Sequence, residues 1–202
     1  MTRGTYIAFE GLEGCGKSTH VTRLAERIDA VATREPGGTR IGAMLRAILA
    51  DPDNTDIAAR AELLLMTADR AQLMHEVIEP TLGAGRHVVS DRSVYSTLAY
   101  QGYGRGLDLE SIRTVNQWAL SNTLPDIVVW IQIPREEAER RLAKRNLDRF
   151  EREGADFFAR IADGFATMAA ADPDRWILID GTQPKDAVAE AIYAAVSGRL
   201  AD

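Results

Sequence analysis

Residues Gly11 to Ser18 read G-L-E-G-C-G-K-S and carry the residue types that bind nucleotide phosphates. In the spacing G-x-x-x-x-G-K-[ST], glycines let backbone N–H groups converge on phosphate oxygens at a helix N-terminus. The ammonium of Lys17 suits the β- and γ-phosphates, and the hydroxyl of Ser18 can ligate Mg²⁺. An apolar stretch precedes the loop and a helical pattern follows it. We therefore expect ATP to bind to Gly11, Leu12, Glu13, Gly14, Cys15, Gly16, Lys17, Ser18 and Thr19.

A carboxylate and a guanidinium, Asp91 and Arg92, directly follow the apolar run 87–90. In open α/β sheets, ligands bind beyond the carboxyl ends of the strands, so both side chains are expected beside the phosphate loop. Asp91 is a predicted Mg²⁺ ligand with Ser18, directly or through water. Arg92 is predicted to clamp a phosphate group.

The stretch Thr33 to Thr39 reads T-R-E-P-G-G-T and follows another apolar run. Pro-Gly-Gly favours a tight turn with free backbone N–H groups, and the planar guanidinium of Arg34 can contact a phosphate through two hydrogen bonds. Taken alone, the stretch is also typical of an ordinary turn between a strand and a helix. Because a phosphate loop is predicted nearby, we favour a second phosphate-binding position.

Short apolar runs alternate with helical patterns along the whole chain. The predicted strands are 6–9, 30–33, 87–90, 127–133 and 176–179. The predicted helices are 17–29, 39–50, 57–82, 94–101, 109–120, 135–145, 157–171 and 185–200. This alternation predicts an α/β fold with a mostly parallel sheet and helices on both faces.

No Gly/Ser-rich linker, low-complexity tract or internal repeat divides the 202 residues. We therefore expect a single domain over residues 1–202. The charged and weakly apolar stretch N-L-D-R-F-E-R-E-G begins at residue 146, between two predicted helices. It predicts a mobile lid at about residues 144–154.

The charge balance limits the classes of partner. The chain carries 24 Lys and Arg against 30 Asp and Glu, a formal net charge of −6. Nucleic-acid polymers are disfavoured as partners, because proteins that bind them usually present a basic face. No apolar run approaches the roughly 18 residues of a membrane span, and no signal peptide precedes the first strand, so no membrane partner is expected. With a single cysteine, which leaves no internal disulfide, these features favour a cytoplasmic protein.

Beyond these signals, the sequence resembles the thymidylate kinases, which phosphorylate dTMP to dTDP with ATP and Mg²⁺. The resemblance implies the P-loop nucleoside monophosphate kinase fold, with a five-stranded parallel sheet and helices on both faces. T-R-E-P-G-G-T and D-R-x-x-x-S-x-x-A-Y-Q are its most specific motifs. The matching stretches are F-E-G-L-E-G-C-G-K-S-T (9–19), T-R-E-P-G-G-T (33–39), A-D-R-A-Q (68–72), S-D-R-S-V-Y-S-T-L-A-Y-Q-G (90–102) and L-D-R-F-E (147–151).

The resemblance implies roles for residues of the acceptor site. It assigns Glu13 to the neighbourhood of the sugar 3′-hydroxyl, and Arg34 and Arg92 to the acceptor phosphate. Asp91 resembles the acidic residue that the family associates with magnesium.

The same resemblance implies a pocket for the base and the sugar. Arg70, from A-D-R, is expected to face O4 of thymine, while Thr97, Tyr100 and Gln101 line the pocket. Met66 stands where the family usually carries a phenylalanine that stacks on the base. The polarizable thioether of methionine can also cover the face of a base, but it selects the base less strictly than an aromatic ring does. The alternative explanation is an ordinary substitution in the core.

Catalysis by such a site requires cations around the transferred phosphoryl group, because charge spreads over its oxygens in the transition state. Lys17 and Arg92 are the predicted cations of the sheet edge. Family members without an arginine inside the phosphate loop, as here with Gly14, supply one from the lid. The resemblance therefore implies the bacterial lid-arginine type, with Arg145 or Arg149 acting.

Three alternatives remain open. Met66, together with Ser93 where the family usually has an aromatic residue, leaves room for a kinase of dUMP or of a modified pyrimidine monophosphate. Deoxynucleoside kinases share an acidic-Arg-Ser triplet after a strand. A P-loop nucleotide switch is the non-enzymatic alternative, although a guanine-reading N-K-x-D is missing from the chain.

The predicted helix 57–82 has more apolar side chains than one buried face requires, although core packing explains most of them. The resemblance implies a homodimer formed through helices. The apolar residues in question are Leu63, Leu64, Met66, Leu73 and Val77.

Overall fold

Five parallel strands form the centre of the protein, in a computed structural model that describes residues 2–143 and 147–200. The strand order within these residues is β2-β3-β1-β4-β5. All five residues of β1 are buried, as expected for a strand covered on both faces. The strands are β1 (Tyr6–Glu10), β2 (Val31–Arg34), β3 (Val88–Asp91), β4 (Ile127–Gln132) and β5 (Trp176–Asp180).

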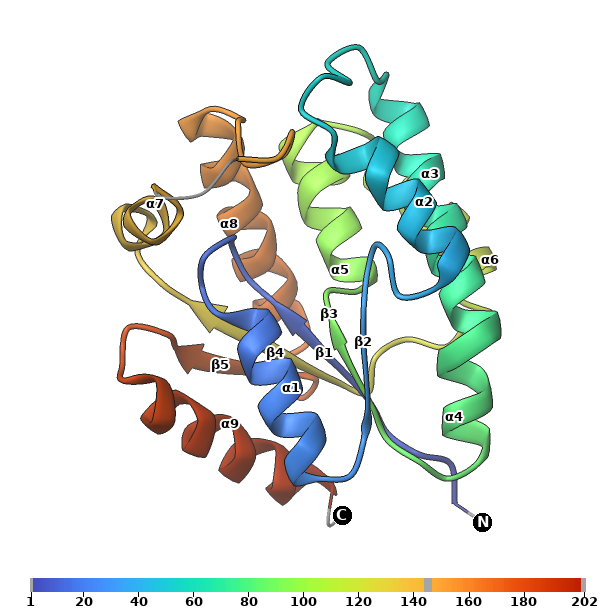
Figure 1. Ribbon diagram of the computed structural model, residues 1–202, viewed down its shortest axis with the longest axis vertical. Helices are drawn as coiled ribbons and strands as arrows, with labels where there is room; N and C mark the ends of the chain where they lie inside the picture. Colours follow the sequence, from blue (N-terminus) through green and yellow to red (C-terminus); the bar gives the residue numbers. More distant parts are fainter. Residues whose placement is uncertain (1, 144–146, 201–202) are drawn as a thin grey trace.

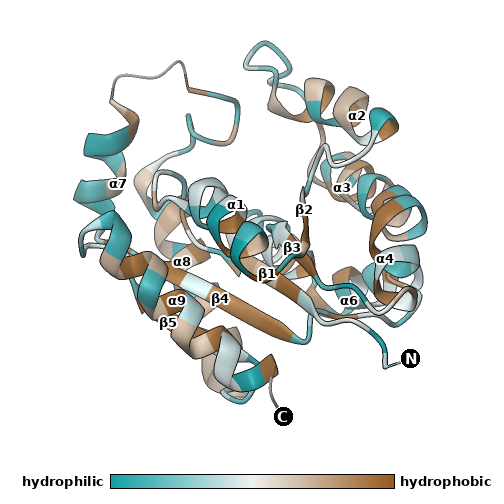
Figure 2. Ribbon diagram, turned by 60° about the horizontal axis from the view of Figure 1, so that its bottom comes forward, coloured by the Kyte–Doolittle hydropathy of each residue, from teal (hydrophilic) through white to brown (hydrophobic). Residues whose placement is uncertain are grey.

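Helices cover both faces of the sheet and so form two layers (Figure 1). On one face, Ile7 and Phe9 of β1 pack in the apolar cluster that includes α1 (Lys17–Arg27) and α9 (Lys185–Leu200). On the other face, strand residues such as Tyr6 and Trp130 meet the second layer. Figure 2 shows the strands as hydrophobic segments between more hydrophilic helices. The second layer includes α3 (Ala59–Leu73), α5 (Val94–Thr97) and α8 (Ala155–Ala171).

The predicted strands and the predicted α/β fold are confirmed. Most strand boundaries differ from the predicted ones by one residue. Two predicted helices differ in detail. The predicted helix 57–82 is divided into α3, the π-helical turn η1 (Met74–Ile78) and α4 (Glu79–Gly83). The predicted helix 94–101 becomes α5 followed by the π-helical turn η2 (Leu98–Gly104). Such wide turns are frequent near functional sites, and η2 carries two predicted site residues.

Most of the surplus apolar side chains of the segment 57–82 pack inside the protomer. Leu63 and Leu73 are buried, whereas Leu64 is 58% exposed. Trp118, on α6 (Leu109–Ala119), is 84% exposed. Helix α3 packs against both α6 and α2 (Arg40–Ala50), which also exposes apolar side chains.

The chain crosses from one side of β1 to the other between β3 and β4, which places a topological switch point at β1. Ligands of open α/β sheets bind outside the carboxyl ends of the strands at such a point. The phosphate loop follows β1 there, and α7 (Arg135–Leu142) follows β4. Within residues 2–143 and 147–200, no helix is both long and apolar enough to cross a membrane.

Candidate active site

The loop after β1 has the geometry of a phosphate cradle. Gly11 and Gly16 have φ of 142° and 96°, in the region that favours glycine. A Cβ on Gly11 would lie 2.6 Å from the carbonyl oxygen of Ile131, so β4 approaches too closely for any side chain. Nζ of Lys17, which is 5% exposed, donates hydrogen bonds to the carbonyl oxygens of Gly11 (3.1 Å) and Leu12 (2.9 Å). The ammonium is therefore held inside the loop.

Two of the predicted loop residues direct their side chains away from the phosphate side. Cys15 is 2% exposed and belongs to the apolar cluster under α1. Leu12 packs against the cluster that contains the aromatic residues of α8. These two residues can offer a ligand only their backbone groups.

The hydroxyl of Ser18 meets the carboxylate of Asp91, with Oγ 2.5 Å from Oδ2. Hydroxyl and carboxylate oxygens are hard donors that suit Mg²⁺, which usually keeps several waters and binds few protein groups in phosphate sites. In the described residues, no cluster of three or more His, Cys, Asp or Glu side chains is placed to hold a metal ion. The Ser18–Asp91 pair therefore fits a magnesium ion shared with nucleotide phosphates.

Arg92 has a left-handed backbone with φ of 77°, although it is not a glycine. Its N–H donates to the carbonyl oxygen of Phe9 (2.9 Å), and its own carbonyl accepts from Oγ of Ser90 (2.8 Å). Such strain persists only where the surroundings enforce it, and it clusters at functional sites. The backbone of β1 and β3 thus fixes the direction of the Arg92 side chain.

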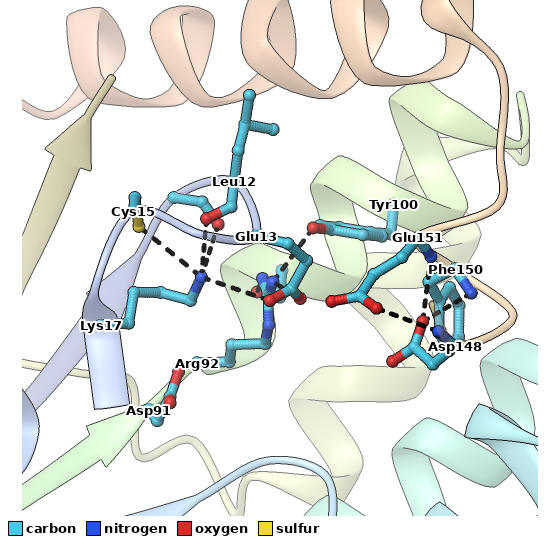
Figure 3. A network of polar contacts seen from close by, with 12 residues as sticks. Leu12, Glu13, Cys15, Lys17, Asp91, Arg92, Tyr100, Asp148, Phe150 and Glu151 are labelled. Carbon is cyan, nitrogen blue, oxygen red and sulfur yellow. Dashed lines mark hydrogen bonds and ion pairs between the residues drawn. The ribbon is translucent and has the colours of Figure 1, made fainter. Parts of the chain in front are cut away.

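The guanidinium of Arg92 lies between the phosphate loop and η2 (Figure 3). Nη2 donates to Oε1 of Glu13 and to the hydroxyl oxygen of Tyr100 (3.0 Å), while Nη1 donates to Oγ of Ser96 (2.8 Å). Burial opposes ionisation of Glu13, but the charges of Arg92 and Lys17 outweigh it and lower its pKa to about 2. Glu13 is therefore a carboxylate at neutral pH. Burial raises the pKa of Tyr100 to about 12, so its hydroxyl stays protonated.

A buried carboxylate at the end of β1, Glu10, supports this arrangement. It is 0% exposed and accepts hydrogen bonds from the hydroxyls of Ser93 (2.7 Å) and Ser96 (2.5 Å) and from the N–H of Ser96 (3.2 Å). Burial raises the pKa of Glu10, against the charge of Arg92. Glu10 thereby ties the end of β1 to the start of α5.

A cavity of about 180 Å³ opens beside Arg92, and most predicted acceptor residues line it. Arg34 reaches it from the end of β2 and is largely exposed. Arg46, from α2, also lines the cavity and donates from Nη1 to the carbonyl oxygen of Pro36 (3.1 Å), which follows a cis peptide bond. The predicted residues in its wall are Glu13, Ser18, Arg34, Met66, Arg70, Asp91, Arg92, Thr97, Tyr100 and Gln101.

Arg70 is 2% exposed and nearly saturated with hydrogen bonds. Nε and Nη2 lie 2.8 Å and 2.7 Å from Oε2 of Glu35, Nη1 donates to Oδ1 of Asn116, and Nη2 also donates to Oγ1 of Thr97 (2.9 Å). Burial raises the pKa of Glu35 to about 7, with the charge of Arg70 opposing this and that of Asp69 adding to it. The guanidinium is thus rigidly oriented in the cavity wall.

The stretch 147–153, inside the predicted lid, lies against the same cavity. Asp148, Phe150 and Glu151 line it, and the ring of Phe150 meets that of Tyr100 edge to face at 6.1 Å (Figure 3). The predicted catalytic residue Arg145 lies outside the described residues.

Arg149, the other predicted lid arginine, is buried away from the phosphate loop. Its exposed fraction is 9%. Nη1 lies 2.6 Å from Oε2 of Glu62, and Nε donates to the carbonyl oxygen of Leu49 (2.8 Å). Its guanidinium is therefore committed to α3 and to the end of α2.

Sequence reasoning missed Glu10, Glu35, Arg46, Glu62 and Arg141. The last, on α7, donates to the carbonyl oxygens of Gly14 and Gly181, each at 3.2 Å, and so joins the phosphate loop to the end of β5. Glu10 and Glu35 lie inside the matching stretches 9–19 and 33–39, and that position is the signal that could have revealed them. The other three lie on helices, where their types and spacing give no such signal.

The arrangement offers a phosphate cradle and a cation-lined cavity that meet at one strained arginine. A nucleotide triphosphate in the cradle and a phosphate-bearing ligand in the cavity would share Arg92, which suits phosphoryl transfer between them.

Similarity to known proteins agrees with this geometry. A family model described as thymidylate kinase matches residues 9–192. Thymidylate kinases of Nitratidesulfovibrio vulgaris and Desulforudis audaxviator are 45% and 40% identical to the chain, over 96% and 98% of it and 97% and 93% of their own lengths. The crystal structure of thymidylate kinase from Ehrlichia chaffeensis matches with a TM-score of 0.78 and 29% identity, covering 96% of this chain and 99% of that one. The chain therefore belongs to the thymidylate kinase family.

Proposed function

We propose that the protein transfers the γ-phosphoryl group of ATP to the phosphate of dTMP and so forms dTDP. The observation that carries this proposal is the position of Arg92, which borders both the phosphate loop and the cavity that holds Arg34 and Arg70. Membership of the thymidylate kinase family supports the choice of acceptor.

The attacking group in this reaction is a phosphate that is already ionised at neutral pH, so no general base is required. Lys17 and Arg92 neutralise the charge that develops on the transferred group, because Lys17 is buried, Arg92 is only 13% exposed, and both cations are fixed before the reaction begins. When bound at Ser18 and Asp91, Mg²⁺ supplies further neutralisation of the phosphate oxygens.

Glu13 and Tyr100 hold the side chain of Arg92 from two directions. Because the pKa of Glu13 is lowered to about 2, this residue is charged at neutral pH, and it accepts hydrogen bonds only. It is therefore suited to accept a hydrogen bond from a hydroxyl of the acceptor sugar.

The experiment that tests the proposed function measures ADP formation with ATP and Mg²⁺ against dTMP, dUMP, dCMP, dGMP, dAMP and thymidine. We expect the highest kcat/KM for dTMP and no activity with thymidine. Activity with thymidine and none with dTMP would instead identify a deoxynucleoside kinase. If ADP forms but no monophosphate increases its formation, the result would indicate a nucleotide switch.

We also propose a two-fold homodimer formed through α2, α3 and α6. These helices pack side by side (Figure 1), and they expose Met44 (60%), Leu64 (58%) and Trp118 (84%). Exposed apolar groups that gather on neighbouring helices are typical of a protein interface.

The predicted single domain, the mobility of the lid and the cytoplasmic location stay predictions.

Replacing Leu64 with glutamate is expected to convert this dimer to monomers. The two-fold axis places two copies of the introduced charge, one from each protomer, in the apolar interface. Light scattering at micromolar concentration should give about twice the 22.2 kDa chain mass for the wild type and the chain mass for Leu64→Glu. Leu178→Glu is the matched control, because Leu178 is 54% exposed but lies on the edge strand β5. A monomeric wild type, or equal masses for the two variants, contradicts the proposed interface.

A further inference from the structure

Glu62 is a buried carboxylate on the first turn of α3 that collects hydrogen bonds from three side chains. It is 0% exposed. Oε1 accepts from Nε2 of Gln101 (2.8 Å) and Nε of Arg105 (3.2 Å), while Oε2 accepts from Nη2 of Arg105 (3.2 Å) and lies 2.6 Å from Nη1 of Arg149. Two guanidinium groups therefore face one carboxylate, and a neutral amide shares it.

These contacts keep Glu62 ionised. Burial opposes its ionisation, but hydrogen bonds from Arg105, Gln101 and Arg149 outweigh the burial and lower its pKa. An ionised carboxylate accepts hydrogen bonds and donates none. The group of Gln101 that faces Glu62 must therefore be the NH₂ group.

The orientation of the Gln101 amide follows from this restriction. With Nε2 directed at Glu62, Oε1 is the atom left for a ligand in the cavity that Gln101 lines. Within the described part of the chain, no residue donates a hydrogen bond to Oε1 of Gln101. Because Oε1 is also not one of the fully buried polar atoms that lack a partner, it stays accessible to a ligand. Gln101 therefore presents a hydrogen-bond acceptor to the cavity.

Arg70 provides the opposite polarity in the same cavity wall, since a guanidinium only donates. Thymine and uracil carry an acceptor at O4 and a donor at N3–H, whereas cytosine carries a donor at N4 and an acceptor at N3. A donor from Arg70 beside an acceptor from Gln101 complements the first pair and opposes the second.

We propose that Glu62 is a specificity-determining positioning residue, which fixes the amide of Gln101 so that the cavity accepts thymine-type bases and rejects cytosine. This inference rests on the proposed function and deepens it. Glu62 touches no substrate and acts through Gln101.

The variant Glu62→Gln tests the inference, because a glutamine at this position has one acceptor atom in place of two. Arg105 and Arg149 compete for that oxygen, which turns the new NH₂ group toward Gln101. The amide of Gln101 then turns and presents Nε2 to the cavity. We expect the ratio of kcat/KM for dTMP to kcat/KM for dCMP to fall by roughly tenfold to a hundredfold.

The ratio separates specificity from general damage, because dTMP and dCMP share sugar and phosphate. Arg105→Met is the matched control: it removes one partner of Glu62 and leaves the bond to Gln101 in place. We expect this variant to lower kcat/KM for both substrates by the same factor. A wild-type ratio in Glu62→Gln, or an equal fall of the ratio in Arg105→Met, overturns the inference. Wild-type enzyme that forms no dTDP overturns the proposed function instead.

A measurement on the wild-type protein keeps the inference testable if Glu62→Gln does not fold. Calorimetry would compare binding of dTMP with that of N3-methyl-dTMP, which has lost the N3–H donor. We expect the methylated nucleotide to bind roughly tenfold to a hundredfold more weakly, because Oε1 of Gln101 then has no donor. Equal affinities would show that Gln101 does not present an acceptor, and would overturn the inference.

Discussion

Replacing Arg92 with methionine is expected to lower kcat for dTMP phosphorylation by about 10³-fold or more, the scale of a transition-state arginine in phosphoryl transfer. Arg92 is the cation that borders both the phosphate loop and the acceptor cavity, and its hydrogen bonds to Glu13, Ser96 and Tyr100 hold it there before substrates bind. Methionine has a similar length and carries no charge. Steady-state kinetics with ATP and dTMP each at saturation gives the effect on kcat.

Arg34→Met is the matched control for this prediction. Arg34 lines the same cavity but is exposed, and its one hydrogen bond within residues 2–143 and 147–200, to the carbonyl oxygen of Gly37, is long at 3.5 Å. We expect this variant to raise KM for dTMP and to leave kcat within about tenfold of the wild-type value, as for an interaction made equally in the ground and transition states. A kcat for Arg92→Met no lower than that of Arg34→Met contradicts the role given to Arg92.

Arg145→Met is expected to lower kcat by about 10³-fold with a smaller change in KM for dTMP, whereas Arg149→Met is expected to lower stability. The phosphate loop carries Gly14 where related enzymes can carry an arginine, so we expect the lid to supply this cation. Arg149 has its guanidinium on Glu62 and on the carbonyl oxygen of Leu49, so its removal takes two hydrogen bonds from the junction of α2 and α3. Its loss is expected to cost about 1–3 kcal/mol of the free energy of unfolding.

Thermal denaturation and steady-state kinetics of the two variants, side by side, check this division of roles. Arg152→Met is a suitable control, since this exposed arginine of the same stretch donates, among the residues that the structure describes, only to the carbonyl oxygen of Leu147. If Arg149→Met keeps the wild-type melting temperature and loses kcat, while Arg145→Met keeps kcat, the catalytic cation is Arg149.

The sequence predicted the fold and the phosphate cradle well, because both depend on local patterns. Apolar runs with helical patterns between them indicate a parallel sheet, and G-x-x-x-x-G-K-S places its own glycines and lysine. The π-helical turns were not predicted, because apolar periodicity near 3.6 cannot separate a helix from one that contains a wider turn.

The supporting carboxylate Glu62 could not be predicted for a different reason. Glu62 and Arg149 are 87 positions apart in the chain, and only the packing of α3 against η2 and the stretch 147–153 brings them together. The motif L-D-R-F-E identified Arg149 as an important cation but not the direction of its side chain. A buried carboxylate such as Glu62 looks in the sequence like any surface glutamate.

In the proposed reaction, the γ-phosphoryl group passes directly from a nucleoside triphosphate to a nucleoside monophosphate at Arg92. Its most direct test uses ATP labelled with ³²P at the γ-phosphorus, together with dTMP and Mg²⁺, and separates the labelled products. We predict that the label appears in dTDP, with one labelled dTDP for each ADP formed. Label that appears only as inorganic phosphate, while dTMP stays unchanged, would contradict it.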